Sequence, residues 1–129
     1  MSHIFVTGIS TEVGKTVASA VLVEALGADY WKPVQAGDLD RSDSMAVGSL
    51  LQHPDSVVHP NAYALNTPMS PHAAAALDGI HIELDAIQRP STDKYLVIEG
   101  AGGLLVPLNQ TDTIADLIFP EDRVVVVSR

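Results

Sequence analysis

A glycine, a lysine and a threonine in direct succession are the first residues of this sequence that could do chemistry together. The stretch Val6 to Leu26 reads VTGISTEVGKTVASAVLVEAL, with Gly14, Lys15 and Thr16 near its middle. Such a glycine lets backbone N–H groups turn toward a phosphate, the lysine neutralises phosphate charge, and the threonine hydroxyl can ligate Mg²⁺. The stretch predicts a phosphate-binding loop.

The start of this loop departs from the usual spacing. The pattern G-x-x-x-x-G-K-[ST] requires a glycine at position 9, where the chain has Ile9, and the nearest glycine is one residue earlier, at Gly8. An ordinary glycine-containing turn would also contain these residues. The apolar run before the loop and the helical pattern after it favour a nucleotide site with a modified start.

A second group of chemically capable residues lies in YLVIEGAGG, from Tyr95 to Gly103. In phosphate-loop proteins a second apolar strand ends in a carboxylate near the metal, and here that carboxylate is Glu99. The glycines at positions 100, 102 and 103 allow the backbone to approach a ligand closely. A solvated glutamate at a strand end is the competing interpretation, and the phosphate loop makes it the weaker one.

Two further charged residues are candidates for the same site. Lys32 follows the predicted second strand in WKPVQAG, and the carboxyl ends of strands in open α/β sheets face the ligand crevice. Asp43 begins a predicted helix in DRSDSMAV, a position where aspartate more often caps the helix than binds a ligand. Asp38 and Asp40 are nearby competitors for a metal role.

The elements that must position these residues alternate between strands and helices. Strands are predicted at 3–7, 30–34, 95–99 and 123–127, and helices at 16–26, 43–51, 70–77 and 83–88, with a helical turn at 113–118. Residues 52–66 are expected to form a long surface loop. Strands that read as continuous apolar runs predict an α/β fold with a mostly parallel sheet and helices on both faces.

The whole chain, residues 1–129, is expected to be one nucleotide-binding domain. The run RVVVV at 123–127 is expected to be a buried interior strand, yet little of the sequence follows it. We therefore expect the chain to be the N-terminal portion of a longer one.

Composition excludes several classes of function. The formal net charge of −9 argues against nonspecific binding to nucleic acid or to an anionic membrane. The absence of cysteine excludes disulfides and thiolate metal sites. No apolar run is as long as a membrane span, and no signal-peptide pattern opens the chain, so a cytoplasmic protein is expected.

Four segments in order carry a resemblance to a known family. TGISTEVGKT, KPVQAG, SDSMAV and EGAGGLLVPL are similar to the corresponding segments of dethiobiotin synthetases, whose phosphate loop has the same longer spacing after its first glycine. The resemblance covers essentially all of this chain but only the first part of a family chain. It implies a P-loop NTPase-like fold and a homodimer.

The resemblance also implies a reaction. Members of the family join CO₂ to 7,8-diaminononanoate and close a ureido ring, using ATP and Mg²⁺. One amine takes up CO₂ as a carbamate, the γ-phosphoryl group of ATP activates the carbamate, and the second amine displaces phosphate. Such catalysis depends on positioning and on charge neutralisation at the transferring phosphoryl group.

Residue roles follow from the resemblance position by position. Lys15 and Lys32 would be catalytic, with Lys32 near the carbamate and the γ-phosphate. Thr16, Asp43 and Glu99 would surround Mg²⁺, and Thr11, Lys32 and Ala36 would lie at the substrate. The nucleotide would contact Glu12, Val13, Gly14, Lys15, Thr16, Val17, Asp43, Glu99, Gly100, Ala101 and Gly102.

One departure and two alternatives remain open. Some relatives have a hydroxyl residue where this chain has Ala36, so Gln35 or backbone groups are the candidates to replace that substrate contact. A cobyrinic-acid-diamide-type amidoligase has a similar loop and sheet but needs a nucleophilic cysteine, which is absent from these residues and would have to lie in a further C-terminal part. A partitioning ATPase of the ParA/MinD type would carry a lysine near the start of the loop, and residues 9–13 contain none.

Overall fold

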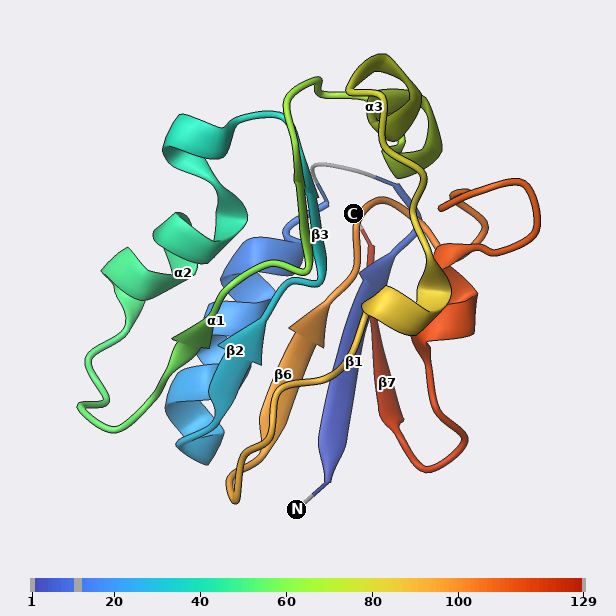
Figure 1. The fold of residues 1–129 in the computed structure, drawn as a ribbon. Coiled ribbons are helices and arrows are strands. Elements are labelled where there is room, and N and C mark those ends of the chain that lie inside the picture. Colours follow the sequence, from blue (N-terminus) through green and yellow to red (C-terminus); the bar gives the residue numbers. More distant parts are fainter. Residues whose placement is uncertain (1, 11–12, 129) are drawn as a thin grey trace.

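The computed structural model describes residues 2–10 and 13–128 of the chain. Its main sheet has five parallel strands in the order β4-β2-β6-β1-β7 (Figure 1). The strands are β1 (His3–Gly8), β2 (Asp29–Trp31), β4 (Val58–His59), β6 (Leu96–Glu99) and β7 (Arg123–Val127). This confirms the predicted parallel α/β sheet, and it brings the carboxyl ends of all five strands to one edge.

Two helices cover one face of the sheet (Figure 1). They are α1 (Lys15–Leu26) and α2 (Asp43–Leu50), close to the predicted ranges. Side chains alternate across each strand, so Ile4 and Val6 of β1 face these helices and pack with Ala20, Val23 and Val47. The small side chain of Ala20 lets α1 approach the sheet closely. Helix α1 ends at Gly27, which has the left-handed conformation that stops a helix.

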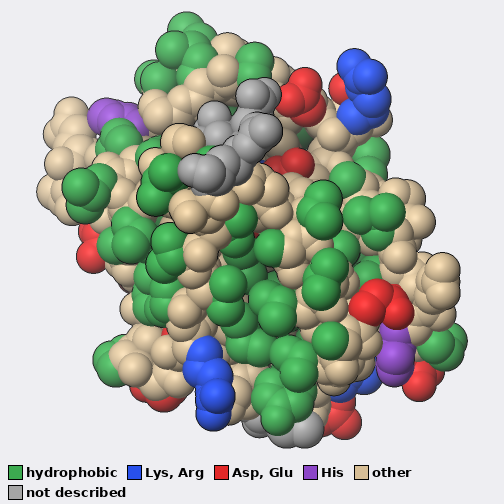
Figure 2. Space-filling model, turned by 180° about the vertical axis from the view of Figure 1, so that it is seen from behind, with side chains coloured by type: hydrophobic (Ala, Val, Ile, Leu, Met, Phe, Trp, Pro, Cys, Tyr) green, Lys and Arg blue, Asp and Glu red, His purple; other side chains and the backbone are tan. Residues whose placement is uncertain are grey.

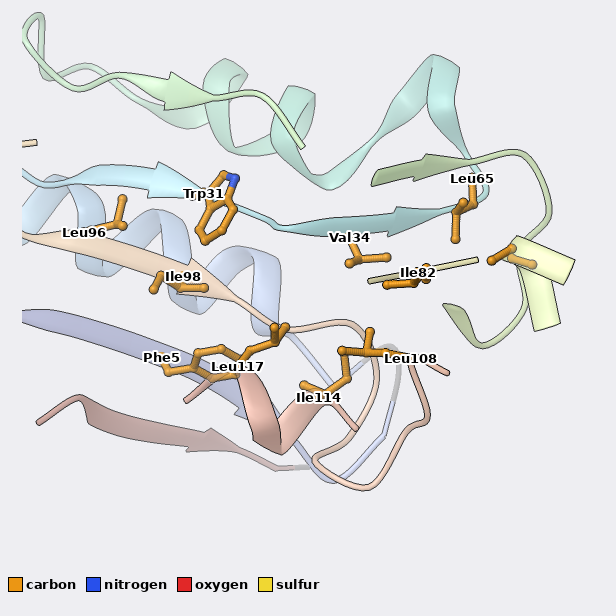
Figure 3. Close-up of a cluster of buried hydrophobic side chains, with 12 residues drawn as sticks. Phe5, Trp31, Val34, Leu65, Ile82, Leu96, Ile98, Leu108, Ile114 and Leu117 are labelled. Atoms are coloured by element: carbon orange, nitrogen blue, oxygen red, sulfur yellow. The ribbon is translucent and has the colours of Figure 1, made fainter. Parts of the chain in front are cut away.

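The opposite face is covered by short turns rather than long helices. Phe5, Trp31 and Ile98 point to this side and pack into the second core cluster, which Figure 3 shows in close-up. Its cover consists of the 3-10 turns η2 (Leu84–Ala86) and η3 (Ile114–Leu117), with helix α3 (Pro71–Leu77) at one end. The helix predicted at 83–88 is therefore only a single turn, and the turn predicted at 113–118 is confirmed.

A small second sheet lies beyond the carboxyl ends of the main strands, next to α3 (Figure 1). It pairs β3 (Val34–Ala36) with β5 (Tyr63–Leu65) in parallel. The strand predicted at 30–34 is confirmed only as far as Trp31, because Pro33 has no N–H for the ladder and the chain passes there from one sheet to the other. The prediction of one long surface loop at 52–66 is also wrong, since β4 and β5 lie within it.

Strand β7 forms an edge of the main sheet among the described residues, where the sequence predicted a buried interior strand. It pairs with β1 on one side, and its Val124 and Val126 side chains are exposed. On the helical face, Val17 and Val21 of α1 are also exposed, and Figure 2 shows hydrophobic side chains gathered on this face. Among the described residues, no helix has the length and apolar character needed to cross a bilayer.

Candidate functional site

The predicted chemical residues gather in one pocket at the carboxyl edge of the sheet. The pocket has a volume of about 690 Å³. The loop between β1 and α1, the segment after β2, the start of α2 and the segment after β6 all contribute to its wall. The predicted residues that line it are Gly14, Lys15, Thr16, Val17, Lys32, Ala36, Asp43, Glu99, Ala101 and Gly102.

The turn into α1 depends on glycine. Gly14 is the residue before the helix and has φ 101°, a conformation that side-chain-bearing residues rarely adopt. At Gly8 an added Cβ would lie 2.5 Å from a methyl carbon of Val13, so the loop closes tightly against the end of β1. The first N–H groups of α1 have no intrahelical acceptors and carry the positive end of the helix dipole, so this turn can receive an anion.

Lys15 lies inside the loop rather than extending into solvent. Its Nζ donates a hydrogen bond to the backbone carbonyl of Ser10 over 2.8 Å, and the residue is buried. Burial lowers the pKa of Lys15, and the negative charge of Glu99 opposes that shift. The lysine is thus held by a carbonyl group of its own loop. Val13 is buried as well, so it can offer a ligand only its backbone, whereas the Val17 side chain is exposed at the pocket.

Glu99 is the buried centre of the site. Its Oε2 accepts a hydrogen bond from the Thr16 hydroxyl over 3.1 Å and lies 3.7 Å from Lys32 Nζ, and its Oε1 accepts one from the Tyr30 hydroxyl over 2.7 Å. Strand register explains this meeting. Tyr30 pairs with Val97, so Lys32 follows alongside Glu99, and alternation turns all four side chains to the α1 face. Burial raises the pKa of Glu99, and the Lys32 ammonium opposes that rise.

Asp43 reaches the same cluster from the start of α2. The cap of α2 is Ser42, whose hydroxyl oxygen accepts a hydrogen bond from the Met45 N–H over 3.2 Å. The competing interpretation of Asp43 as the helix cap is therefore wrong, and its carboxylate forms an ion pair with Lys32. The Asp43 N–H donates to the side-chain oxygen of Gln35 over 3.2 Å, which fixes the start of the helix relative to β3.

The donor set fits a magnesium ion. A hydroxyl and two carboxylates offer the hard oxygen ligands that Mg²⁺ prefers, and the Lys32 ammonium between Asp43 and Glu99 shows that this space accepts a cation. Within residues 2–10 and 13–128, no cluster of three or more His, Cys, Asp or Glu side chains could hold a metal ion. Phosphate oxygens and waters would therefore have to complete the coordination of a bound Mg²⁺.

The remaining predicted residues divide into three groups. The segment Gly100–Gly102 follows β6: the Gly100 N–H donates to the Val6 carbonyl, and Gly102 has φ 70°. Ala36 lines the pocket, but Gln35 is not free to replace a substrate contact, since its amide nitrogen donates to the Gly37 carbonyl over 3.0 Å. The predictions for Thr11 and Glu12 lie outside the described residues.

Sequence reasoning did not find Tyr30 or Ser42 as parts of this site, and it named Gln35 only as a possible substrate contact. Ser42 and Asp43 are adjacent and both can cap a helix, so the sequence alone does not separate them. Tyr30 is in a predicted strand, and its neighbour Lys32 was already a candidate. A search for polar side chains two residues before a candidate on the same strand would have identified it.

Comparison with known proteins places this geometry in a family. A family model described as an AAA domain matches residues 2–129. The chain belongs to this AAA-domain family. The match agrees with the predicted P-loop NTPase-like fold, and ATP-binding loops of this kind join a strand to a helix as β1 joins α1 here.

Several curated relatives share a name. The chain is 65% identical over 125 residues to the ATP-dependent dethiobiotin synthetase BioD of Christiangramia forsetii, covering 97% of this chain and 60% of the relative. It is 55% identical over 128 residues to the BioD of Cytophaga hutchinsonii, covering 98% and 62%. It is 53% identical over 124 residues to that of Rhodopseudomonas palustris, covering 96% and 58%. The chain thus spans about three fifths of the length of these relatives.

Proposed function

We propose that this chain is the phosphate- and metal-binding part of a dethiobiotin synthetase. The observation that carries the proposal is the meeting of Lys15, Thr16, Lys32, Asp43 and Glu99 in one pocket, from four separate segments of the chain. The shared name of relatives at 53–65% identity supports it.

The proposed reaction uses ATP, CO₂ and 7,8-diaminononanoate, the substrates that the family resemblance implies. One amine of the diamine forms a carbamate with CO₂ and releases a proton. A carbamate oxygen then takes the γ-phosphoryl group, with ADP leaving. The second amine attacks the carbamate carbon, phosphate leaves with its bonding electron pair, and the ureido ring closes. Dethiobiotin, ADP and phosphate are the products.

The residues of the pocket suit these steps. The Gly14 turn and the start of α1 receive the β- and γ-phosphates, and Lys15 neutralises their charge from within the loop. Thr16, Asp43 and Glu99 would hold Mg²⁺, which supplies charge neutralisation at the phosphates when bound. The Lys32 ammonium lies between the carboxylates of Asp43 and Glu99. From there it can contact the carbamate and the γ-phosphate and stabilise the negative charge that moves between them.

Further parts of the proposal rest on the resemblance and the composition. The adjacent backbone of Gly100, Ala101 and Gly102, the loop residues Thr11 and Glu12, and Ala36 would line the nucleotide and diamine crevice. We propose a cytoplasmic homodimer that binds neither nucleic acid nor membranes. Sedimentation velocity of the purified protein tests the oligomeric state.

The decisive test is nucleotide binding with and without the loop lysine. Lys15→Ala removes the cation at the phosphates, and we expect ATP affinity in the presence of Mg²⁺ to fall at least thirtyfold, on the order of 2–3 kcal/mol for an unmade charged contact. Lys94→Ala is the matched control, because Lys94 does not line the pocket. Isothermal titration calorimetry measures both. Unchanged ATP affinity in the Lys15 variant would overturn the phosphate-loop assignment.

Phosphate release then identifies the reaction. ATP cleavage that requires both 7,8-diaminononanoate and bicarbonate supports the synthetase. Cleavage that requires glutamine instead would support the amidoligase alternative, and cleavage triggered by a partner surface would support a partitioning ATPase.

A further inference from the structure

The phenol of Tyr30 lies beneath Glu99, on the side of the carboxylate away from the pocket. Its hydroxyl donates to Glu99 Oε1 over 2.7 Å, and neither residue has more than 1% of its surface exposed. The pocket wall includes Glu99 but not Tyr30. Tyr30 therefore acts on the pocket through the carboxylate of Glu99.

The ring of Tyr30 packs in the core, and a phenylalanine ring could pack in the same way. The hydroxyl serves instead to donate a hydrogen bond to Glu99. The ring belongs to the apolar cluster beneath α1, with Ile4, Val6, Val23 and Val97. The hydroxyl donates its proton toward Glu99 Oε1 over 2.7 Å, and both residues are buried. A polar group at the centre of an apolar cluster is costly unless it is hydrogen-bonded, and this one is bonded to Glu99.

The two oxygens of Glu99 consequently have different surroundings. Oε1 is held by Tyr30 within the core, whereas Oε2 accepts from Thr16 and faces the Lys32 ammonium. A carboxylate fixed in this way offers one oxygen to the pocket. Turning it to offer both would break a buried hydrogen bond to a charged group.

This difference bears on which cation the site accepts. Mg²⁺ requires near-octahedral geometry with short bonds and commonly takes one or two carboxylates together with waters and phosphates. Ca²⁺ is larger, accepts six to eight oxygens and readily takes both oxygens of one carboxylate. Groups that orient a metal-binding side chain typically affect metal affinity 10- to 100-fold.

We propose that Tyr30 is a positioning residue that confines Glu99 to one metal-facing oxygen and thereby makes the site select Mg²⁺ over Ca²⁺. The inference rests on the proposed function, because it requires Glu99 to serve a nucleotide-bound cation. It adds a residue outside the pocket wall, acting through the carboxylate it holds.

Tyr30→Phe tests the proposal, since it removes the hydroxyl and keeps the ring. The probe is a non-hydrolysable ATP analogue, whose affinity is titrated at increasing Mg²⁺ or Ca²⁺ by calorimetry. In the variant we expect the affinity for Mg²⁺ to fall about tenfold. We expect the affinity for Ca²⁺ to change less than about threefold, so the Mg²⁺/Ca²⁺ selectivity ratio drops. Tyr95→Phe is the matched control. Tyr95 directly precedes β6 and packs against the same cluster, whereas the side-chain hydroxyls that donate to Glu99 among the described residues are those of Thr16 and Tyr30.

The outcomes separate the two proposals. A wild-type chain that binds no analogue with either metal would defeat the proposed function itself. A wild type that binds with Mg²⁺, beside a Tyr30 variant with an unchanged selectivity ratio, would overturn only the role of Tyr30. Thermal unfolding of each variant is measured in parallel. A lower Tm with an unchanged ratio would make the Tyr30 hydroxyl purely structural and would also overturn the inference.

Discussion

Replacement of Lys32 by glutamine is expected to destabilise the protein, because it leaves Glu99 buried without its cation. Lys32 Nζ lies 3.7 Å from Glu99 Oε2, and the two side chains are 7% and 1% exposed. At that distance an effective dielectric constant of 20 gives about 4.5 kcal/mol of attraction. The Asp43 partner is 34% exposed and therefore screened, so it adds little.

The net loss is smaller than the Coulomb energy. Tyr30 and Thr16 still donate to Glu99 in the variant, and water can enter beside the shorter glutamine. We expect the free energy of unfolding to fall by about 2–4 kcal/mol at pH 7, near the range for removing one partner of a buried ion pair. This corresponds to a Tm lower by roughly 10 °C.

The stability penalty of Lys32→Gln should increase with pH. Burial raises the pKa of Glu99 above the ordinary value of 4.5, so its ionisation costs stability as the pH rises through the folded value. Lys32 opposes that rise, and without it the pKa moves further up. The penalty of Lys32→Gln should therefore be smaller near pH 4.5 than at pH 7, because the charged form of Glu99, which needs Lys32, becomes more populated as the pH rises.

Urea unfolding followed by fluorescence of Trp31, the single tryptophan, measures this penalty at both pH values. Lys94→Gln is the control. Its ammonium lies 3.5 Å from Asp29 but is 30% exposed, so it should lose less than about 1 kcal/mol. A Lys32 variant within 1 kcal/mol of wild type at pH 7, or a penalty equal at both pH values, would refute the reasoning.

Two further predictions concern the loop and the far end of β2. Gly14→Ala places a side chain at φ 101° and should cost about 1–2 kcal/mol of stability together with ATP affinity. Gly79→Ala, at φ 71° with open space around it, is the control and should cost similar stability while leaving ATP affinity unchanged. Urea unfolding measures the stability of both variants, and calorimetry measures their ATP affinity. Equal ATP affinities in the two variants would contradict the assignment of Gly14 to the phosphate loop. At Asp29, burial opposes ionisation, but hydrogen bonds from the Val57 N–H and His59 outweigh it and lower the pKa. Ionised Asp29 stabilises the folded state above about pH 4, and this stabilisation is lost as the pH falls through its lowered pKa in the folded protein. In Asp29→Asn the free energy of unfolding should therefore fall less steeply between pH 5 and pH 2.5 than in the wild type. An unchanged acid limb in urea unfolding would show that the hydrogen bonds of Asp29 are not its source.

The parts of the site that are local in sequence could be predicted from the sequence. Gly14, Lys15 and Thr16 are adjacent, and the strand before them and the helix after them have clear apolar patterns. Glu99 ends an apolar run and is followed by glycine, which fixes its place at the carboxyl edge of the sheet. These features depend on neighbours within one strand or one turn.

The parts that depend on strand pairing could not be predicted. The Tyr30 hydroxyl meets Glu99 because β2 pairs with β6 in one particular register, and a shift by one residue would turn it to the other face. Strands β4 and β5 are too short to show a period of two. Strand β7 has four consecutive valines after Arg123, although it lies at the edge of the sheet formed by the described residues. Neighbours distant in sequence, which decide burial in a sheet, leave no local pattern.

The strand order has a consequence for how this protein folds. Strand β1 is at the start of the chain, yet His3 pairs with Leu96 of β6 and Ile4 pairs with Arg123 of β7. During synthesis β1 must therefore wait until β6 has been made before its first partner strand exists. Such distant pairing slows folding and leaves an apolar strand exposed to aggregation meanwhile. The phosphate loop directly follows β1, so it should take its final shape only after β1 has paired with β6.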